Sequence, residues 1–384
     1  MQLTKNASAK LSNTISLQES ANRSFIYRNT FPLHLEPELD RLYGALYSSL
    51  SYFRGTADLL GLNTYVARNH DGIITAIFLF KIENGMLRVA NEGMRLQASD
   101  VVEFSRFVFE NYPSVSAVSF HAVQVSNEAI PFIHQGFFCT EDFIAELPNS
   151  RDEYLSSLGK STKKTLKWSL NRIERTFPSF SFQVHERENI REEDVRAIVE
   201  MNHARMSVKG KVSHLDEAKV QENLRLLREC GALCLATIDG EVCAGTTVFR
   251  IGDSVISRIN AHDPKYDPYR LGMVCCYLAA CASIERGARR FHFGHTKYDY
   301  KVSLGGRFQA YEHIVIYRSR LHFLGKMHHA IRVAAEGYRV LFSRKLLESA
   351  ESESGIFWDT TRKGLQLWRS LKKKNHDNEL VPLH

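Results

Sequence analysis

The sequence predicts two α/β domains in tandem, each built on a mixed β-sheet. The first observation is length, because 384 residues exceed what one ordinary hydrophobic core organises. The second is that one order of elements occurs twice along the chain: an antiparallel meander of strands, then a helix, then a further strand. The third is that a helix between two strands is typical of a parallel connection, which makes the sheet mixed.

The composition indicates a globular protein of a reducing compartment. Hydrophobic residues make up 44% and charged residues 24% of the chain, and the net charge of +7 favours an anionic partner. A phosphate-bearing cofactor, RNA and an acidic membrane surface all meet that condition. The seven cysteines lie mostly in apolar runs without metal-ligand spacing, so we expect a cytoplasmic, bacterial-type protein without disulfides or a metal.

Residues 25–145 are expected to form the first domain, after a disordered tail at 1–24 that lacks the apolar core of a secretory signal. Helical spacing of Leu39, Leu42 and Leu46 supports a helix, and the turn signals at Asp71 and Asn84 support a meander. The expected elements are a strand at 24–30, a helix at 35–53, three strands within 63–93, a helix at 98–113, a strand at 115–123 and a short helix at 127–138 that ends at Gly136.

Residues 146–319 are expected to form the second, catalytic domain. The apolar run from Leu271 to Ile284 is shorter than the ~20 residues of a membrane span, so a buried helix explains it better. The expected elements are a strand at 142–148, a long basic helix at 150–177, a strand at 179–186, helices at 191–210 and 216–231, a meander at 232–263, the apolar helix, and strands at 289–294 and 310–319.

The remaining residues, 320–384, are expected to be a basic helical extension. Leu365, Trp368 and Leu371 share one helical face, and three lysines follow them. Two interpretations stay open. The helix can dock on the anionic inner face of a membrane, or it can pack on the domain and leave its charged end in solvent.

The second half resembles the GNAT acyltransferases, and within them the CelD-like acetyltransferase group. The resemblance rests on the meander "IDGEVCAGTTVF" and on the stretch "RLGMVCCYLAACASIERGARRFHFG", which is followed by "YK". The stretch "YDYKVSLGGRFQAYEH" is also similar to a segment of the Fem-type peptidyltransferases, which are tandem GNAT-like pairs. The residues that match are Asp239, Gly240, Ala244, Gly272, Glu285, Gly287, Phe291, Phe293, Gly294, Tyr300 and Lys301.

This resemblance implies two tandem GNAT-like domains and an acyltransferase. The donor would be a thioester, either acetyl-CoA, a longer acyl-CoA or an acyl carrier protein. The acceptor would be an amine or hydroxyl of a sugar, peptide or lipid precursor, as in cell-envelope or polysaccharide biosynthesis. One alternative is a Fem-like peptidyltransferase that takes its aminoacyl group from tRNA. A second is a non-catalytic binding module that keeps the fold. No DNA partner is expected.

In the GNAT family a Q/R-x-x-G-x-G/A loop opens a helix and binds the coenzyme A pyrophosphate through backbone N–H groups. The corresponding positions are Tyr269, Gly272 and Val274, so the first and last depart from the pattern, and Arg270 is displaced by one position. The residues that the resemblance assigns to the cofactor are Tyr269, Arg270, Leu271, Gly272 and Met273.

A run of polar residues follows the strand "RRFHFG" and should line the cleft beyond its carboxyl end. Aminolysis of a thioester needs a base for the amine and an acid or cation for the sulfur or the oxyanion. Asp299 or His295 is the candidate base, and Tyr298 or Tyr300 the candidate acid. Lys301 matches the lysine of the Fem-type segment and is the candidate for the oxyanion or a phosphate. A surface loop with ordinary charges is the alternative.

The candidates for the acceptor side are His203 and Arg205, on a helix that resembles the family's "H-x-x-R" helix, and His262, a rival base at a strand end. A further feature is one basic helical face, which can bind RNA phosphate or lipid headgroups or be a solvated surface. Its residues are Lys160, Lys163, Lys164 and Lys167, with Trp168 beside them.

Overall fold

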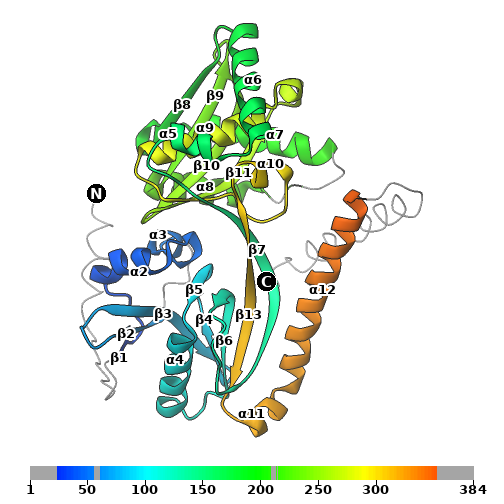
Figure 1. Ribbon diagram of the computed structural model, residues 1–384. Helices are drawn as coiled ribbons and strands as arrows, with labels where there is room; N and C mark the ends of the chain where they lie inside the picture. Colours follow the sequence, from blue (N-terminus) through cyan, green and yellow to red (C-terminus); the bar gives the residue numbers. More distant parts are fainter. Residues whose placement is uncertain (1–23, 56–60, 209–212, 214, 353–384) are drawn as a thin grey trace, which may run out of the picture.

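A single mixed sheet runs through the whole protein (Figure 1). The structure is a computed structural model, and it describes residues 24–55, 61–208, 213 and 215–352. Within these residues thirteen strands form the sheet in the order β1-β2-β3-β4-β6-β13-β7-β12-β11-β10-β9-β8, with β5 paired to β6. The mixed α/β sheet is therefore confirmed, but it is continuous between the two halves of the chain.

The first half contains the predicted meander of three antiparallel strands within residues 63–93. The expected helix at 35–53 is broken, because Gly44 takes the left-handed conformation (φ 52°) and ends the first helix. Two short 3₁₀ turns, Leu33–Leu35 and Leu46–Ser48, flank that helix. The elements are β1 (Ser24–Tyr27), α2 (Glu36–Tyr43), α3 (Leu50–Phe53), β2 (Asn63–Arg68), β3 (Ile74–Glu83), β4 (Met86–Val89), β5 (Met94–Leu96), α4 (Ala98–Asn111), β6 (Ala117–Val125) and β7 (Ile133–Glu146).

Aromatic side chains form the core of this half. Phe104 of α4 lies 4.7 Å from Tyr65 of β2 and 4.9 Å from Phe78 of β3, measured between ring centroids. Phe78 in turn contacts Phe120 of β6 edge-on at 5.5 Å. Tilted and edge-to-face pairs of this kind are favourable beyond the apolar area they bury. Helix α4 is thereby held on one face of the sheet.

The short helix predicted at 127–138 is wrong, because the chain forms strand β7 from Ile133 onward. Strand β13 (Arg307–Tyr317) pairs with β7 antiparallel, from Ile133 opposite Tyr317 to Ile144 opposite Arg307. The aromatic and β-branched residues of this stretch favour a strand once such a partner is present. The partner lies far away in the sequence, so the local pattern could not reveal it.

The second half contains the remaining elements. The helix predicted at 150–177 is two helices, since Leu158 is extended (ψ 156°) and ends the first of them. The elements are α5 (Arg151–Ser157), α6 (Lys160–Thr176), β8 (Ser181–Glu186), α7 (Glu192–Val208), α8 (Glu217–Cys230), β9 (Gly231–Ile238), β10 (Glu241–Ile251), β11 (Ser254–His262), α9 (Leu271–Glu285), β12 (Arg290–His292), α10 (Asp299–Ser303) and β13.

Helix α9 is the buried helix that its apolar run predicts. Nearly all its residues are buried, and it packs between α5 and α6 on one side and strands β9 to β11 on the other. A helix that is apolar all round belongs inside a protein. Helices α7 and α8 cover the opposite face of the same strands, so the second half has three layers.

Two features join the halves. Strand β13 pairs with both β6 and β7, although it follows the second half in the sequence. Leu46 of the first half is buried in the core that α7 and α8 form with β9 to β11. An ion pair of 3.1 Å also links Arg54 to Glu229 of α8. The domain boundary expected at 145/146 falls where β7 ends, and it stays a prediction.

The chain continues into α11 (Arg320–Gly325) and α12 (Met327–Ser352), which lies along β7 at the edge of the molecule (Figure 1). The expected helical extension is thus present as far as Ser352. The apolar face predicted around Trp368, and the tail predicted at 1–24 except for Ser24, lie outside the described residues. Among the helices that the structure describes, none is long and apolar enough to cross a membrane.

Candidate active site

The candidate site lies where strands β11 and β12 part. The two strands pair in parallel only from Ser254 opposite Arg290 to Ile256 opposite His292. Strand β11 then continues to His262, whereas the chain after β12 turns away into the loop that leads to α10. The side chain of Asn260 spans this opening, and its Nδ2 donates to the carbonyl oxygen of Gly272 at 3.3 Å and to Tyr300 Oη at 3.5 Å. Such a parting at the carboxyl ends of parallel strands is where open α/β sheets bind ligands.

Helix α9 points its N-terminus at this opening. No side chain caps it, so its first N–H groups are available to an anion, and the helix dipole adds a partial positive charge. The residue before the helix, Arg270, is exposed and has φ 54°, a conformation that costs a non-glycine residue about 1–2 kcal/mol. In this conformation Arg270 also ends the 3₁₀ turn Pro264–Tyr269, and its N–H donates to the carbonyl oxygen of Asp267 at 2.9 Å. Leu271 is buried in the core, so it can offer only its backbone, and the partly buried Met273 already donates its N–H to the Arg270 carbonyl oxygen at 3.0 Å.

Gly272 is required by a close contact with His262. A Cβ atom on Gly272 would lie 2.5 Å from His262 Nδ1. The other ring nitrogen of His262 pairs with Asp267 Oδ1 at 2.6 Å, which fixes the ring against the start of α9. His262, predicted as a substrate-binding residue and rival base, is therefore already committed to a carboxylate and to the helix.

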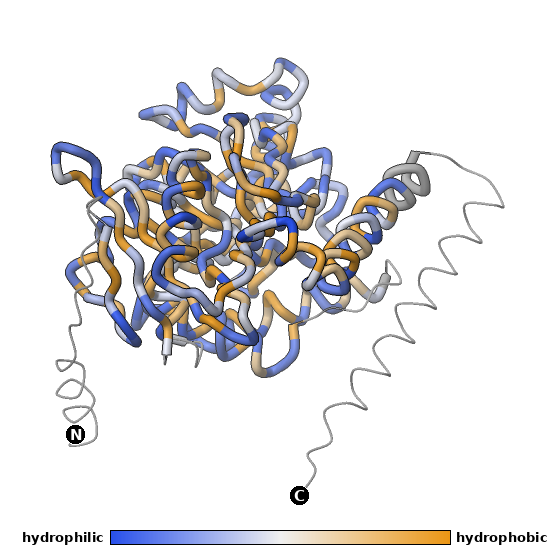
Figure 2. Tube along the Cα trace, turned by 90° about the horizontal axis from the view of Figure 1, so that it is seen from below, coloured by the Kyte–Doolittle hydropathy of each residue, from blue (hydrophilic) through white to orange (hydrophobic). Residues whose placement is uncertain are grey.

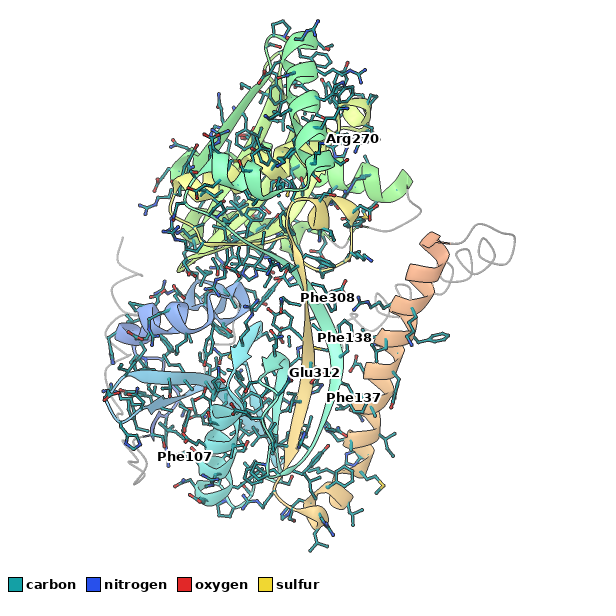
Figure 3. The ribbon with its side chains drawn as sticks, in the orientation of Figure 1. Phe107, Phe137, Phe138, Arg270, Phe308 and Glu312 are labelled. Atoms are coloured by element: carbon teal, nitrogen blue, oxygen red, sulfur yellow. The ribbon has the colours of Figure 1, made fainter. Side chains whose placement is uncertain are left out.

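Tyr269 belongs to a stack of side chains beside the same helix end. The guanidinium of Arg172 lies 4.9 Å from the ring of Trp168 and 4.7 Å from the ring of Tyr269. Phe177 packs on Tyr269 from the other side at 5.2 Å. The stack joins the basic face of α6 to Arg270, which Figure 3 labels beside these helices. A basic surface thus leads to the N-terminus of α9.

Lys301 holds the loop after β12 in place. Its side chain is 4% exposed, and its Nζ donates to the carbonyl oxygens of Gly294 at 2.9 Å and His295 at 2.6 Å. Burial lowers the pKa of Lys301 to about 8. The next residue in the loop, Thr296, has φ 71°, which is strained for a β-branched residue. These contacts favour a positioning role for Lys301, and its oxyanion role stays a prediction.

The other predicted catalytic residues lie around this loop. His295 and Asp299 are exposed, and Asp299 is in the first turn of α10. Although His295 is exposed, its pKa is lowered by partial desolvation of the ring and by the Lys301 ammonium. The imidazole is therefore neutral near pH 7 and can accept a proton. Burial raises the pKa of Tyr300, so its hydroxyl stays protonated. Tyr298 stacks on Tyr300 at 6.0 Å.

Sequence reasoning missed three polar residues of this region. Besides Asn260, they are Asp142 of β7 and His292 of β12, whose Nδ1 lies 2.7 Å from Asp142 Oδ2. Asp142 Oδ1 also accepts the backbone N–H of Gly294 at 2.9 Å, so it fixes the start of the loop. The buried His292 Nε2 has no hydrogen-bond partner among the described residues. These residues come from separate strands, and only the folded sheet brings them together.

The acceptor-side candidates Arg205 and His203 both lie on α7. The Arg205 charge opposes the rise that burial causes in the pKa of Tyr300, and it adds to the lowering of the pKa of Lys301. The Nε of Arg205 is buried and has no hydrogen-bond partner in the part of the chain that the structure describes. His203 instead contacts the carbonyl oxygen of Leu215 at 3.0 Å.

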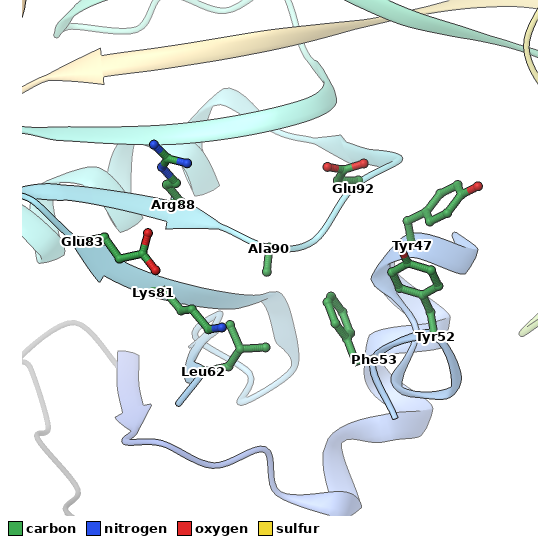
Figure 4. A pocket seen from close by; sticks show the side chains of 9 residues that line it. All are labelled: Tyr47, Tyr52, Phe53, Leu62, Lys81, Glu83, Arg88, Ala90 and Glu92. Atoms are coloured by element: carbon green, nitrogen blue, oxygen red, sulfur yellow. The ribbon is translucent and has the colours of Figure 1, made fainter. Parts of the chain in front are cut away.

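A separate pocket of about 390 Å³ lies in the first half (Figure 4). Aromatic side chains line one wall and charged side chains from β3, β4 and the loop after β4 line the other. One of its residues, Tyr47, lies 5.9 Å from the guanidinium of Arg258 on β11, so the pocket borders the second half. The described residues contain no group of three or more His, Cys, Asp or Glu that could hold a metal. The lining residues are Tyr47, Tyr52, Phe53, Leu62, Lys81, Glu83, Arg88, Ala90 and Glu92.

A family model described as acetyltransferase (GNAT) domain matches residues 160–302. This stretch is therefore similar to the GNAT acetyltransferase domain. It runs from α6 through the opening between β11 and β12 to Lys301, so it contains the whole candidate donor site. No curated protein sequence matches the chain.

Solved structures match the fold at low sequence identity. The crystal structure of FemX has a TM-score of 0.56 at 12% identity, over 78% of this chain and 99% of that one. L-PGS from Bacillus licheniformis gives 0.46 at 14% identity, over 80% and 98%. A tandem GNAT protein from the clavulanic acid biosynthesis pathway gives 0.35 at 10% identity, over 77% and 97%. The predicted fold class, a mixed α/β protein with tandem GNAT-like units, is confirmed.

Proposed function

We propose that the protein is an acyltransferase that moves an acetyl or longer acyl group from a thioester donor, acyl-CoA or acyl carrier protein, to an amine or hydroxyl. The observation that carries this proposal is the uncapped N-terminus of α9, preceded by the strained Arg270 and placed at the parting of β11 and β12. The GNAT family model covers this region. Membership of the CelD-like group is part of the same proposal.

The donor binds through its phosphates on this helix end. Backbone N–H groups of α9 and the guanidinium of Arg270 meet the pyrophosphate, because a helix N-terminus favours negative charge. The Arg172 guanidinium, held between Trp168 and Tyr269, supplies a second cation beside it. The close packing of Gly272 on His262 keeps the helix start where the strands part.

The acyl group then lies between β11 and the loop after β12. The neutral His295 accepts the proton of the attacking amine or hydroxyl, directly or through water, and the nucleophile adds to the acyl carbonyl carbon. One amide hydrogen of Asn260 leaves its long 3.5 Å contact with Tyr300 Oη and donates to the oxyanion that forms. When the carbon–sulfur bond breaks, the Tyr300 hydroxyl protonates the departing thiolate, and solvent restores its proton. Lys301 and Asp142 keep the loop in the geometry that these steps need.

The acceptor approaches from the side of the first half. Arg205 of α7 has a buried Nε without a hydrogen-bond partner among the described residues, and this supports a role in holding a polar acceptor group. The pocket of the first half combines aromatic and charged walls, which fits a sugar, peptide or lipid precursor. This supports an acceptor-side role for the first half, in cell-envelope or polysaccharide biosynthesis.

A second candidate function is a Fem-like transfer from aminoacyl-tRNA. The observation that favours it is the lysine face of α6, which extends the basic surface well beyond the helix end that a coenzyme A pyrophosphate would occupy. A long row of cations is typical of a polyanion site. A third reading, a binding module without catalysis, predicts that neither donor binds.

Thermal unfolding of the purified protein with coenzyme A, acetyl-CoA, a long-chain acyl-CoA or bulk tRNA separates these functions. A donor at a hundred times its dissociation constant adds ~2.7 kcal/mol to stability, which is visible as a higher melting temperature. We expect a shift with one acyl-CoA that Arg270→Glu abolishes and the control Arg228→Glu, on α8 across the sheet, retains. A shift with tRNA alone would support the ligase, and no shift at all would favour a carrier-protein donor or the binding module.

A further inference from the structure

Helices α11 and α12 pack on the protein by one face only. Ala330, Val333 and Gly337 form that face and lie against β7 and β13. A Cβ atom on Gly337 would lie 2.4 Å from Phe137 Cβ, so the helix and strand are in close contact there. Figure 3 labels Phe137 and Phe138 on the strand beside α12. The rest of the surface of both helices is exposed, and it carries an unusual set of side chains.

Six large apolar side chains are exposed on these two helices, and we call them the apolar stripe; the ring of one of them, Tyr338, also contacts Phe137 of β7 edge-on at 5.5 Å. They are half of the twelve large apolar side chains that are exposed in the described part of the chain, and each is 42–79% exposed. Four of them recur along α12 with helical spacing, and two continue the row on α11. Figure 2 shows apolar and polar residues alternating along this helix at the edge of the molecule. The apolar stripe consists of Leu321, Leu324, Met327, Ile331, Tyr338 and Phe342.

Basic side chains border the apolar stripe. Arg320, Arg332, Arg339 and Lys345 are all exposed on α11 and α12. The one acidic side chain described on the exposed surface of these two helices is Glu336, and it pairs with Arg339 at 3.1 Å. An amphipathic helix with apolar residues on one face and Lys or Arg beside them is the pattern that lies in the interface of an anionic bilayer.

We propose that the apolar stripe and its basic border dock the protein on the surface of an anionic phospholipid bilayer. The apolar stripe could be covered by a second copy of the chain, by residues 353–384 or by a bilayer, and the charge pattern distinguishes these three. A second copy of the chain would bring a second basic border against the first, and residues 353–384 also carry more Lys and Arg than Asp and Glu. A bilayer with anionic headgroups complements the border and accepts the apolar side chains. The inference does not depend on the donor or on acyl transfer.

Vesicle co-sedimentation of the full chain tests the proposal. We expect binding to vesicles of equal parts phosphatidylglycerol and phosphatidylcholine and at least tenfold weaker binding to phosphatidylcholine alone. The double variant Ile331→Gln/Phe342→Gln should lose this binding. The matched control Leu33→Gln/Ile73→Gln removes exposed apolar side chains elsewhere and should keep it. Arg332→Gln should weaken binding on the order of fivefold, because one basic residue near an anionic surface contributes about that factor.

Three results would overturn the proposal. The first is no binding of the full chain to anionic vesicles. The second is binding that the apolar-stripe variant retains and that Lys160→Gln/Lys164→Gln on α6 abolishes, since the lysine face would then be the lipid site. The third is a dimer in sedimentation velocity that Ile331→Gln/Phe342→Gln dissociates, because the apolar stripe would then bind a second copy. Circular dichroism of each variant checks that the fold is kept.

Discussion

At the scale of single residues, Lys301 shows how burial changes what a side chain can do. Its ammonium is enclosed and donates to two backbone carbonyl oxygens, those of Gly294 and His295. Those carbonyls precede the strained Thr296. The energy that holds the strained loop therefore includes the hydrogen bonds of one lysine.

Replacing Lys301 by methionine should destabilise the protein by roughly 1–3 kcal/mol near neutral pH, because two buried carbonyl oxygens lose their donor. The loss should grow at alkaline pH. The pKa of Lys301 is about 8 in the fold and 10.5 in the unfolded chain, so the unfolded state binds more protons between those values. Wild-type stability therefore gains from this residue as pH rises from about 8 to 10.5, and the variant lacks the gain. Thermal unfolding of both proteins across this range measures the difference.

The exposed neighbour Lys297 offers the matched control for this series. Lys297→Met should change stability by less than about 0.5 kcal/mol, as surface substitutions usually do. A gap between wild type and Lys301→Met that narrows as pH rises would show that Lys301 is not a buried cation.

The residues that the sequence could predict for the site lie together in two short stretches. The first stretch, 269–273, lies at the start of the recognisable apolar helix, and the second, 295–301, follows the strand β12. The residues within each stretch are close in space because they are close in the chain. Asn260, Asp142 and His292 could not be predicted, because they lie on different strands and only the order of strands in the sheet makes them neighbours.

At the scale of elements, the start of α9 depends on one close contact. Gly272→Ala should lower stability by about 1–3 kcal/mol, because the new methyl group meets a ring that Asp267 holds in place. In a His262→Ala background the ring is gone, and alanine is the better helix former. There the same substitution should be neutral or stabilising by up to about 1 kcal/mol. Urea unfolding of the four proteins of this double-mutant cycle measures both effects, and an equal loss in both backgrounds would contradict the contact.

The elements that could be predicted were those with a strong local pattern, such as α4, α9 and the two meanders. Strand β7 could not, because its partner β13 is remote in the sequence. The breaks in the predicted long helices both carry a glycine. Gly44 ends the first of these helices. Gly159 follows Leu158, where α5 ends, and it is the N-cap residue of α6.

At the scale of the whole molecule, a continuous sheet and a shared core should make the two halves unfold together. Leu46→Ala should cost about 2–5 kcal/mol, because the deleted side chain leaves a cavity in the core beneath α7 and α8. The variant should still unfold in a single thermal transition, at a lower melting temperature than wild type. The exposed Leu33→Ala is the matched control and should change stability by less than about 0.5 kcal/mol. Scanning calorimetry that resolved a second transition in Leu46→Ala would show that the halves are independent.

The fold places an exposed arginine at the start of α9, an opening between β11 and β12 and the pocket of the first half along one molecule, and the proposed donor site at α9 is the central claim. The most direct test is the affinity of acyl-CoA, by titration calorimetry, for wild type and for Arg270→Gly. Glycine takes the φ of 54° without strain, so the variant should be slightly more stable, yet it should bind the donor at least about tenfold more weakly. Equal affinity in the two proteins, or no binding by either, would contradict a donor site at the N-terminus of α9.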